Sequence, residues 1–460
     1  MKTRIVDGCK FANQNPPMMS VAQKLFSGSF AVAVWFLAMA IFVFPANAGP
    51  VQLFSVRNPF APLLVGGDDN SAAPSLSPDG RFVVFISAAN DLVPGGNSFY
   101  SLNVFLHDCA SNTTVLVSGN LSGTGGGNGS SMLGQVSTNG QFVVFQSDAS
   151  NLVPNDTNGV TDIFVRDLVA GTTTLVSVST NGGPANGAST DPIMTPDGRY
   201  VAFISRASNL VPGYTNGIPG VFVRDLVAGT NDLVSVGALC SAPVDACTIM
   251  ATPVMTPDGR YVAFFSLATN LVSAVPATTT GEVYVRDRLM GTTTWASTNA
   301  TAIVSAMVQQ TNATSYHPRL SDDGQYVAFK TGTTTLTGVA VILQYDLTTG
   351  ATAVINTNGI GGNVGVDETY GPEMTPDGRF IAFARHEGST DSGYASVHVW
   401  DTQLALDTLV SDDGSGVPAN TTSHTPNISP DGRFVAFLSN AANLVGNTVS
   451  SGFHIYLCDL

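Results

Sequence analysis

Charged residues, and lysine above all, are scarce in this chain. Of the 460 residues only 11% are charged, and Lys330 is the only lysine after Lys24. The formal net charge is −15, and the part of the chain after residue 48 is more acidic still, because the first 48 residues are net positive. An acidic, lysine-poor surface repels phosphate backbones and anionic lipid headgroups. These deficits argue against a coiled coil, a charged disordered tail, a nucleic-acid binder or a membrane-surface binder.

Cysteine is scarce too, with five in the whole chain. No two of them are spaced as C-x-x-C, so neither a zinc site nor a redox motif is indicated. Cys240 and Cys247 share a Ser/Pro/Ala-rich stretch and could close a loop disulfide in an oxidising compartment. Cys109 and Cys458 lie in apolar, β-like segments, where we expect buried free thiols.

Long apolar runs are absent except near the N-terminus, where residues 30–44 are all apolar. This run follows Lys24 and ends in Pro45-Ala-Asn-Ala48, a pattern typical of a secretory signal peptide. A spanning helix needs roughly 20 apolar residues, so an uncleaved anchor is the weaker alternative. We therefore predict that residues 1–48 are a signal peptide. The mature protein would then be secreted or periplasmic, without membrane insertion.

One sequence unit recurs seven times along the rest of the chain. The string Met194-Thr-Pro-Asp-Gly-Arg-Tyr-Val-Ala-Phe203 returns at 255–264 and, with two changes, at 374–383. The turn glycines of the seven copies are Gly80, Gly140, Gly198, Gly259, Gly324, Gly378 and Gly432. A repeat of about 59 residues is typical of stacked or radially arranged units. The copies fill residues 49–460, which we interpret as a single domain.

Each copy is predicted to form four short strands. The first ends at (Ser/Thr)-Pro-Asp-Gly, where Asp-Gly supplies the positive φ angles of a tight hairpin. The second is Arg-(Tyr/Phe)-Val-Ala-Phe, the third is typified by 163–167, and the fourth by 175–178. Four antiparallel strands per repeat, arranged around an axis, predict an all-β, seven-bladed β-propeller.

The two ends of the repeat region predict how the ring closes. The last copy stops at its third strand, 454–460, and has no fourth. The segment 51–56, Val-Gln-Leu-Phe-Ser-Val, precedes the first copy and resembles the fourth-strand pattern. We therefore predict that this N-terminal strand completes the last blade, because an unclosed ring would leave sheet edges exposed.

The repeat (Ser/Thr)-Pro-Asp-Gly-Arg-(Tyr/Phe)-Val-Ala-Phe, followed by Val-(Phe/Tyr)-Val-Arg-Asp, resembles the WD-like repeat of TolB-type β-propellers. The resemblance covers residues 51–460. It implies the propeller fold and an exported, interaction-type role. Similar repeats occur in prolyl-oligopeptidase-like peptidases and in some polysaccharide lyases. This sequence has no G-x-S-x-G nucleophile elbow, so the resemblance implies a fold rather than an activity.

Residues present in every copy are predicted to be structural. An aspartate ends each third strand, and we expect it to accept hydrogen bonds from the following turn. These aspartates are Asp108, Asp167, Asp225, Asp287, Asp346, Asp401 and Asp459. The repeated arginines are expected to cover the blade surfaces, with their stems packed on aromatic neighbours.

Polar residues that vary between copies are better candidates for a binding site. The innermost strand of a blade lines the channel, and blades 5 to 7 would place His317, Arg319, Glu373 and Asn427 near one side of it. Such donors could bind a small anionic or polar ligand. The alternative is a water-filled polar channel with an Arg319–Glu373 ion pair.

One loop has the composition of a cation site. Residues 155–162 carry oxygen-bearing side chains at Asp156, Asn158 and Asp162, and calcium takes six to eight oxygen ligands. The alternative is an Asn-Gly turn with exposed acids. No other cofactor is expected.

These observations favour a secreted or periplasmic, non-enzymatic propeller that serves as a protein-interaction or ligand-binding platform. We expect a monomer whose partner is an envelope or extracellular protein, or a glycan. The first alternative is an extracellular carbohydrate-active enzyme, a lyase or hydrolase, with its site at the channel mouth. The second is a calcium-dependent glycan-binding protein.

Overall fold

A computed structural model describes residues 52–53, 69–94, 101–214, 218–238, 252–268, 270–273, 275, 281–308, 313–333, 339–360, 371–386, 394–446 and 452–460. The chain divides into two units, residues 1–45 and 46–460. The predicted signal peptide and the Cys240/Cys247 pair lie outside the described residues. Within the ranges given, no helix is long and apolar enough to cross a membrane.

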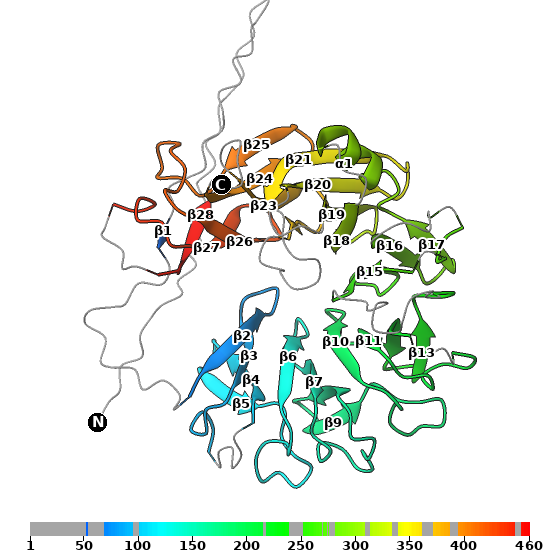
Figure 1. The fold of residues 1–460 in the computed structure, drawn as a ribbon. Helices are drawn as coiled ribbons and strands as arrows, with labels where there is room; N and C mark the ends of the chain where they lie inside the picture. The colour runs from blue at the N-terminus through cyan, green and yellow to red at the C-terminus, as the bar shows by residue number, and fades with distance from the viewer. Residues whose placement is uncertain are drawn as a thin grey trace, which may run out of the picture. The chain divides into compact units, whose positions relative to one another are not determined.

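The second unit is a ring of seven four-stranded antiparallel blades (Figure 1). Blade 1 is β2 (Ser71–Leu76), β3 (Phe82–Ser87), β4 (Asn103–Asp108) and β5 (Thr113–Leu116). Blade 2 is β6 (Ser131–Val136), β7 (Phe142–Ser147), β8 (Asp162–Asp167) and β9 (Thr172–Leu175). Blade 3 is β10 (Ser189–Met194), β11 (Tyr200–Ser205), β12 (Gly220–Asp225) and β13 (Thr230–Leu233). Blade 4 is β14 (Val254–Met255), β15 (Tyr261–Ser266), β16 (Glu282–Asp287) and β17 (Thr292–Trp295).

The last three blades complete the ring. Blade 5 is β18 (Ala313–Leu320), β19 (Tyr326–Thr333), β20 (Val339–Asp346) and β21 (Thr352–Ile360). Blade 6 is β22 (Glu373–Met374), β23 (Phe380–His386), β24 (Ala395–Asp401) and β25 (Leu406–Leu409). Blade 7 is β26 (Ser423–Ile428), β27 (Phe434–Ser439), β28 (His454–Asp459) and, from the start of the chain, β1 (Gln52–Leu53).

The pairing of β1 with β28 confirms the predicted closure. Gln52 lies opposite Leu457 and Leu53 opposite Tyr456 in an antiparallel register. Figure 1 shows the blue β1 beside the red β28, so the two ends of the repeat region share one sheet. Tyr456 is the equivalent in blade 7 of Phe164 in blade 2, and Phe164 pairs with Leu175 of the fourth strand there. Leu53 therefore has the register of a normal fourth strand.

The Asp-Gly turns form as predicted, and side chains fix them. In blade 3, Thr195 Oγ1 donates to Asp197 Oδ1 at 2.6 Å and accepts the backbone N–H of Tyr200 at 2.9 Å. Asp197 Oδ1 also accepts the backbone N–H of Arg199. The turn glycine, Gly198, has φ +80°, a conformation that side chains rarely adopt. The repeated motif therefore specifies a self-capped hairpin.

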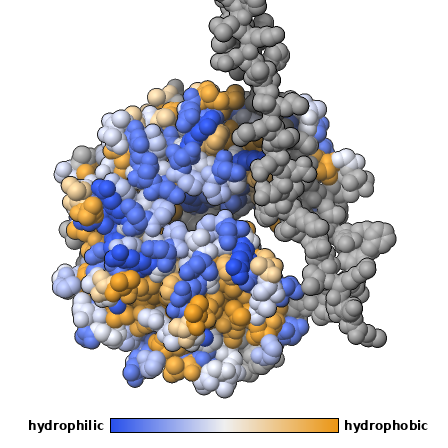
Figure 2. Space-filling view, turned by 180° about the vertical axis from the view of Figure 1, so that it is seen from behind, coloured by the Kyte–Doolittle hydropathy of each residue, from blue (hydrophilic) through white to orange (hydrophobic). Residues whose placement is uncertain are grey.

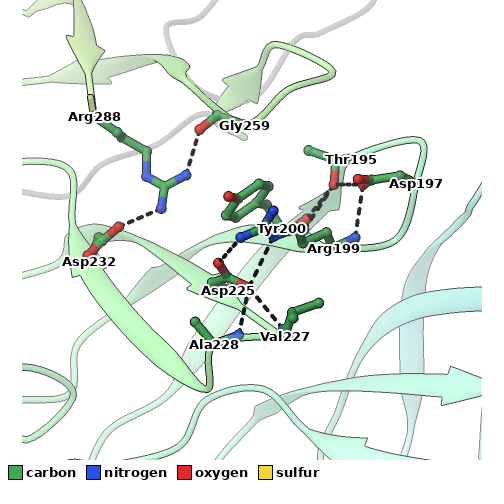
Figure 3. A network of polar contacts seen from close by, with 10 residues as sticks. All are labelled: Thr195, Asp197, Arg199, Tyr200, Asp225, Val227, Ala228, Asp232, Gly259 and Arg288. Atoms are coloured by element: carbon green, nitrogen blue, oxygen red, sulfur yellow. Dashed lines mark hydrogen bonds and ion pairs between the residues drawn. The ribbon is translucent and has the colours of Figure 1, made fainter. Parts of the chain in front are cut away.

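The aspartate at the end of the third strand accepts turn N–H groups as predicted in six blades, Asp459 being the exception, and in five blades it also pairs with an arginine. Asp225 Oδ1 accepts the backbone N–H groups of Val227 and Ala228, which caps the following turn (Figure 3). Its other oxygen, Oδ2, lies 2.9 Å from Arg199 Nη2. The guanidinium of Arg199 in turn lies 4.7 Å from the centroid of the Tyr200 ring, as a cation–π contact. We call this arginine–aspartate pair, which five of the blades have, the clamp.

Neighbouring blades interlock through the same motif. A Cβ on Gly259 of blade 4 would lie 2.4 Å from Cδ2 of the Tyr200 ring in blade 3, so only glycine fits there. Arg288 of blade 4 covers the same ring at 4.8 Å, donates to the Gly259 carbonyl and pairs with Asp232 of blade 3 (Figure 3). Equivalent glycine–aromatic contacts occur in the pairs Gly140–Phe82, Gly198–Phe142, Gly324–Tyr261, Gly378–Tyr326 and Gly432–Phe380.

The interface between blades 7 and 1 lacks this contact. A Cβ on Gly80 would have no neighbour within 4 Å, unlike those on the other six turn glycines. Leu76, at the end of the inner strand β2, is 63% exposed, whereas its blade 3 equivalent Met194 is buried. Closure of the ring therefore rests on β1 within blade 7 rather than on packing between these two blades.

Four features differ from the sequence-based expectation. The fourth strand of blade 2 is Thr172–Leu175 rather than 175–178. It ends there because the backbone N–H of Ile163 donates to the Ser177 hydroxyl instead of to a backbone carbonyl of the fourth strand. A nine-residue helix, α1 (Ala300–Val308), packs on blade 5. Blades 5 and 6 form one continuous sheet where Gly359 pairs with Arg385.

The fourth difference concerns the cysteines. Cys458 is a buried free thiol as predicted, and burial raises its pKa to about 12. Cys109 is also a free thiol, but it is exposed. The expectation of burial was wrong there because this residue follows Asp108, so it belongs to the turn and not to the strand.

Candidate functional site

The inner strands carry a local distortion that the sequence analysis missed. In five blades the residue at the bulge has a positive φ without being glycine. These residues are Ala73, Leu133, Asp191, His317 and Thr425. Each lies within a register shift of the first hairpin, as between Tyr316 and Arg319. A bulge rotates the residues that follow it relative to those before it, so it decides which side chains reach the channel. In four of the five blades a proline follows this residue, although proline favours extended φ angles in the residue before it.

Arg319 and Glu373 meet across the border between blades 5 and 6. Arg319 Nη2 lies 2.7 Å from Glu373 Oε1 and its Nε lies 3.0 Å from Oε2, a bidentate pair. Arg319 Nη1 donates to the carbonyl of Pro318. Both partners are only partly exposed. The structure thus brings together two of the four predicted channel residues, in the ion pair that formed the alternative interpretation.

His317 and Asn427 are placed differently from this pair. His317 is buried, with its ring 5.1 Å from that of Tyr316 in an edge-to-face contact. Asn427 lies exposed on β26, opposite Ala436. Figure 2 shows that hydrophilic side chains border the opening in the middle of the ring on the face it displays. The channel mouth is therefore polar, and of the four predicted residues Arg319 and Glu373 are in direct contact.

The loop before β8 buries both of its acids, Asp156 and Asp162. Asp156 is 7% exposed and Asp162 is fully buried, so the alternative of exposed acids was wrong. Asp162 accepts hydrogen bonds from Ser177 Oγ and from Asn158 Nδ2, at 2.5 and 2.6 Å. Burial raises the pKa of Asp162 to about 6, and the charge of Asp156 adds to that rise. No group of three or more His, Cys, Asp or Glu side chains in the described ranges is placed to hold a metal ion.

Blade 6 contains a Ser–His–Asp hydrogen-bond chain that the sequence did not reveal. His398 Nε2 lies 3.1 Å from Ser396 Oγ, and His398 Nδ1 lies 3.0 Å from Asp407 Oδ1. Arg385 also pairs with Asp407. Ser396 and His398 are both buried, and His398 stacks on Phe383 in the place where other blades carry a stacked aromatic. A buried hydroxyl cannot attack a substrate, so this chain satisfies polar groups inside the blade.

The turns between the third and fourth strands expose apolar side chains on several blades. These residues are Val169 (80%), Val227 (78%), Leu289 (75%), Met290 (67%) and Leu404 (67%). Four of the five come from the adjacent blades 2, 3 and 4, and we call Val169, Val227, Leu289 and Met290 the apolar rim. They lie at the end of the blades that carries the Asp-Gly turns, because Tyr200 pairs with Asp225 across β11 and β12. Leucine and valine are unusual in a tight turn, so the sequence alone could have indicated these exposed apolar side chains.

A groove borders the apolar rim between blades 3 and 4. Its volume is about 340 Å³, and it is lined by Tyr200, Asp232, Asp258, Gly259, Arg260, Arg288 and Leu289. Figure 3 shows the Arg288–Asp232 pair and the Tyr200 ring that form part of it. Tyrosine and arginine, which line this groove, are enriched in protein–protein interfaces.

Comparison with known proteins places the fold. No protein-family model and no curated protein sequence matches the chain. Among solved structures, an oligogalacturonate lyase in complex with manganese is 14% identical, with a TM-score of 0.51 over 90% of this chain and 98% of the other. An oligogalacturonate lyase from Vibrio parahaemolyticus is 12% identical, with a TM-score of 0.49 and the same coverage of both chains. TolB from Acinetobacter baumannii is 15% identical, with a TM-score of 0.34 over 73% of this chain and 62% of its own.

At such low identity the likeness concerns the fold alone. The seven blades, each with four antiparallel strands, are formed by the repeat that carried the sequence resemblance. The arginine–aspartate clamps and glycine–aromatic contacts explain why that repeat is kept in copy after copy. The chain is a seven-bladed β-propeller, built from a repeat that resembles the one in TolB-type propellers.

Proposed function

We propose that this chain is an exported, non-enzymatic β-propeller that binds a protein partner across the apolar rim of blades 2 to 4. The supporting observation is the recurrence of exposed valine, leucine and methionine at equivalent turn tips of three adjacent blades. Scattered apolar residues are normal on a surface, but a recurrent group beside a groove is typical of an interaction site. The partner would be an envelope or extracellular protein, since the N-terminal sequence predicts export.

Rigidity of the ring supports this role. The terminal aspartates cap the turns of blades 2 to 4, and glycine–aromatic contacts pack each of these blades against the next. A partner that binds several turn tips at once loses less entropy on a surface that is already ordered. The repeated motif therefore holds the apolar rim in a constant geometry.

The test compares capture of partners by two sets of variants. The rim variant carries Val169→Thr, Val227→Thr and Leu289→Gln. The control variant carries Leu121→Gln and Val417→Thr, which alter two exposed apolar residues at the opposite end of the blades. Each mature protein is cross-linked in its native envelope or medium and the retained proteins are quantified. We expect the rim variant to retain at least tenfold less of a stoichiometric partner, with an unchanged melt and an unaffected control. Equal retention by both variants would contradict the proposal.

The second candidate function is a carbohydrate-active enzyme with its site at the channel mouth. The observation that favours it is the overlap with an oligogalacturonate lyase along nearly the whole of both chains. Lyase action on oligogalacturonate yields an unsaturated product, which ultraviolet absorbance detects. Turnover by the wild type that is lost in Arg319→Gln, with the same melt, would establish this function in place of the non-enzymatic one.

A further inference from the structure

Blade 2 contains two buried carboxylates with no cation beside them. Asp156 and Asp162 are both more than nine-tenths buried. Asp156 Oδ1 is a buried oxygen without a hydrogen-bond partner. The hydrogen bonds to Asp162 come from a hydroxyl and an amide, which are neutral groups. Buried charges are normally paired with an opposite charge or coordinate a metal.

The equivalent loop of blade 3 shows what fills this space when the acids are absent. The segments 149–167 and 207–225 align without a gap, and Asn155 and Gly213 both have positive φ. Tyr214 takes the place of Asp156, and Gly220 takes the place of Asp162. A Cβ on Gly220 would lie 2.8 Å from the Tyr214 hydroxyl oxygen. The side chain at the first position therefore points at the second position.

The comparison defines a vacated volume in blade 2. In blade 3 the Tyr214 ring packs edge-to-face on Phe222, and its hydroxyl donates to the Ile218 carbonyl. An aspartate is much smaller than a tyrosine, so Asp156 leaves room in front of its carboxylate that the phenol fills in blade 3. A small polar space lined by carboxylate oxygens suits an ion better than an apolar group.

We propose that blade 2 binds a divalent cation, calcium by its oxygen chemistry, between the carboxylates of Asp156 and Asp162. The Ala185 carbonyl supplies a neutral oxygen nearby, because it accepts a hydrogen bond from the same Asn158 Nδ2 group that donates to Asp162. Water would complete the six to eight ligands that calcium takes. Two carboxylates place the site in the weak, extracellular class, with a Kd of roughly 10⁻⁴ to 10⁻³ M.

Blade 3 provides the residues for a matched control variant of blade 2. Asp156→Tyr with Asp162→Gly transfers the blade 3 pair to blade 2 and fills the space instead of emptying it. Asp156→Asn is a milder change that keeps the volume and removes one charge. Equilibrium dialysis with radioactive calcium measures the ions bound per mature chain, and circular dichroism checks the fold of each variant.

We expect the wild type to bind one calcium ion, with Asp156→Asn binding at least tenfold more weakly and the transferred pair binding none. No binding by the wild type at 10 mM calcium, about tenfold above the weakest expected Kd, would overturn the proposal. Undiminished binding by Asp156→Asn would also overturn it, by placing the ion elsewhere. The outcome is independent of the apolar rim, because dialysis requires no partner protein.

Discussion

At the scale of single residues, neighbouring blades are held together where a turn glycine packs against an aromatic side chain of the preceding blade. Gly259 combines two constraints, a φ of +72° and a Tyr200 ring that leaves no space for a Cβ. Gly80 has the first constraint only, because its φ is +69° but nothing lies within 4 Å. The two glycines therefore separate the energetic effect of backbone conformation from that of packing between blades.

Alanine at these two positions should destabilise the protein unequally. Gly80→Ala should cost about 1–2 kcal/mol from the left-handed backbone alone. Gly259→Ala adds overpacking against the tyrosine ring, which costs a further 1–3 kcal/mol or so. Urea unfolding of both variants measures the difference. Equal losses would show that the tyrosine ring yields freely and does not lock the blades.

At the scale of elements, the clamp makes the stability of five blades depend on pH. The Arg199 guanidinium beside Asp225, helped by the turn N–H groups of Ala228 and Val227, lowers the pKa of that carboxyl to about 2. A carboxyl whose folded pKa lies below its unfolded value of about 3.8 stabilises the fold above that value. That stabilisation is lost as the pH falls from about 4 towards 2. Five blades carry such a clamp, at Asp108, Asp225, Asp287, Asp401 and Asp459.

Replacing the clamp arginine by glutamine, which blade 2 has at this position, should change how much stability the protein loses in acid. Blade 2 has Gln141 in place of the arginine, and its amide reaches Asp167 at 3.1 Å. Arg199→Gln should therefore fold normally and lose less stability between pH 4 and pH 2 than the wild type does. Gln141→Arg should lose more, because it adds a charged partner. The unfolding free energy measured at several pH values tests both directions, and parallel pH profiles for all three proteins would refute the clamp as their source.

The repeated elements were predictable from sequence, whereas the candidate sites were not. Strand positions, Asp-Gly turns and the role of the terminal aspartates follow from local patterns such as Thr195–Tyr200, which recur and so reinforce one another. The burial of Asp156 depends on how the loop folds over blade 2, and the Arg319–Glu373 pair depends on the border between two blades. Neither follows from spacing along the chain. The bulge that buries His317 is a backbone conformation that no residue type by itself specifies.

At the scale of the whole molecule, the N-terminal strand decides whether the ring is complete. β1 covers the edge of β28, and the interface between blades 7 and 1 offers no glycine–aromatic contact in compensation. Without β1 the last blade would present an unpaired edge strand, which is an aggregation hazard. The N-terminal strand should therefore matter more to the fold than its length indicates.

Two truncations of the mature chain test this dependence. A chain that begins at Val51 keeps β1, and a chain that begins at Arg57 lacks it. We expect the shorter chain to melt several degrees lower, over a broader range, and to aggregate at concentrations that the longer one tolerates. Calorimetry and light scattering measure both effects. Superimposable transitions would mean that β1 contributes nothing to closure.

The proposal that the apolar rim binds a protein partner has the most direct test of all. A photo-reactive amino acid is placed at Val227 in one protein and at Val417, at the opposite end of the blades, in another. Both proteins are then irradiated in their native envelope or medium. The account predicts one specific cross-linked protein from position 227 and none from position 417. A partner that cross-links from position 417 alone would contradict it, and so would the absence of any specific product from position 227.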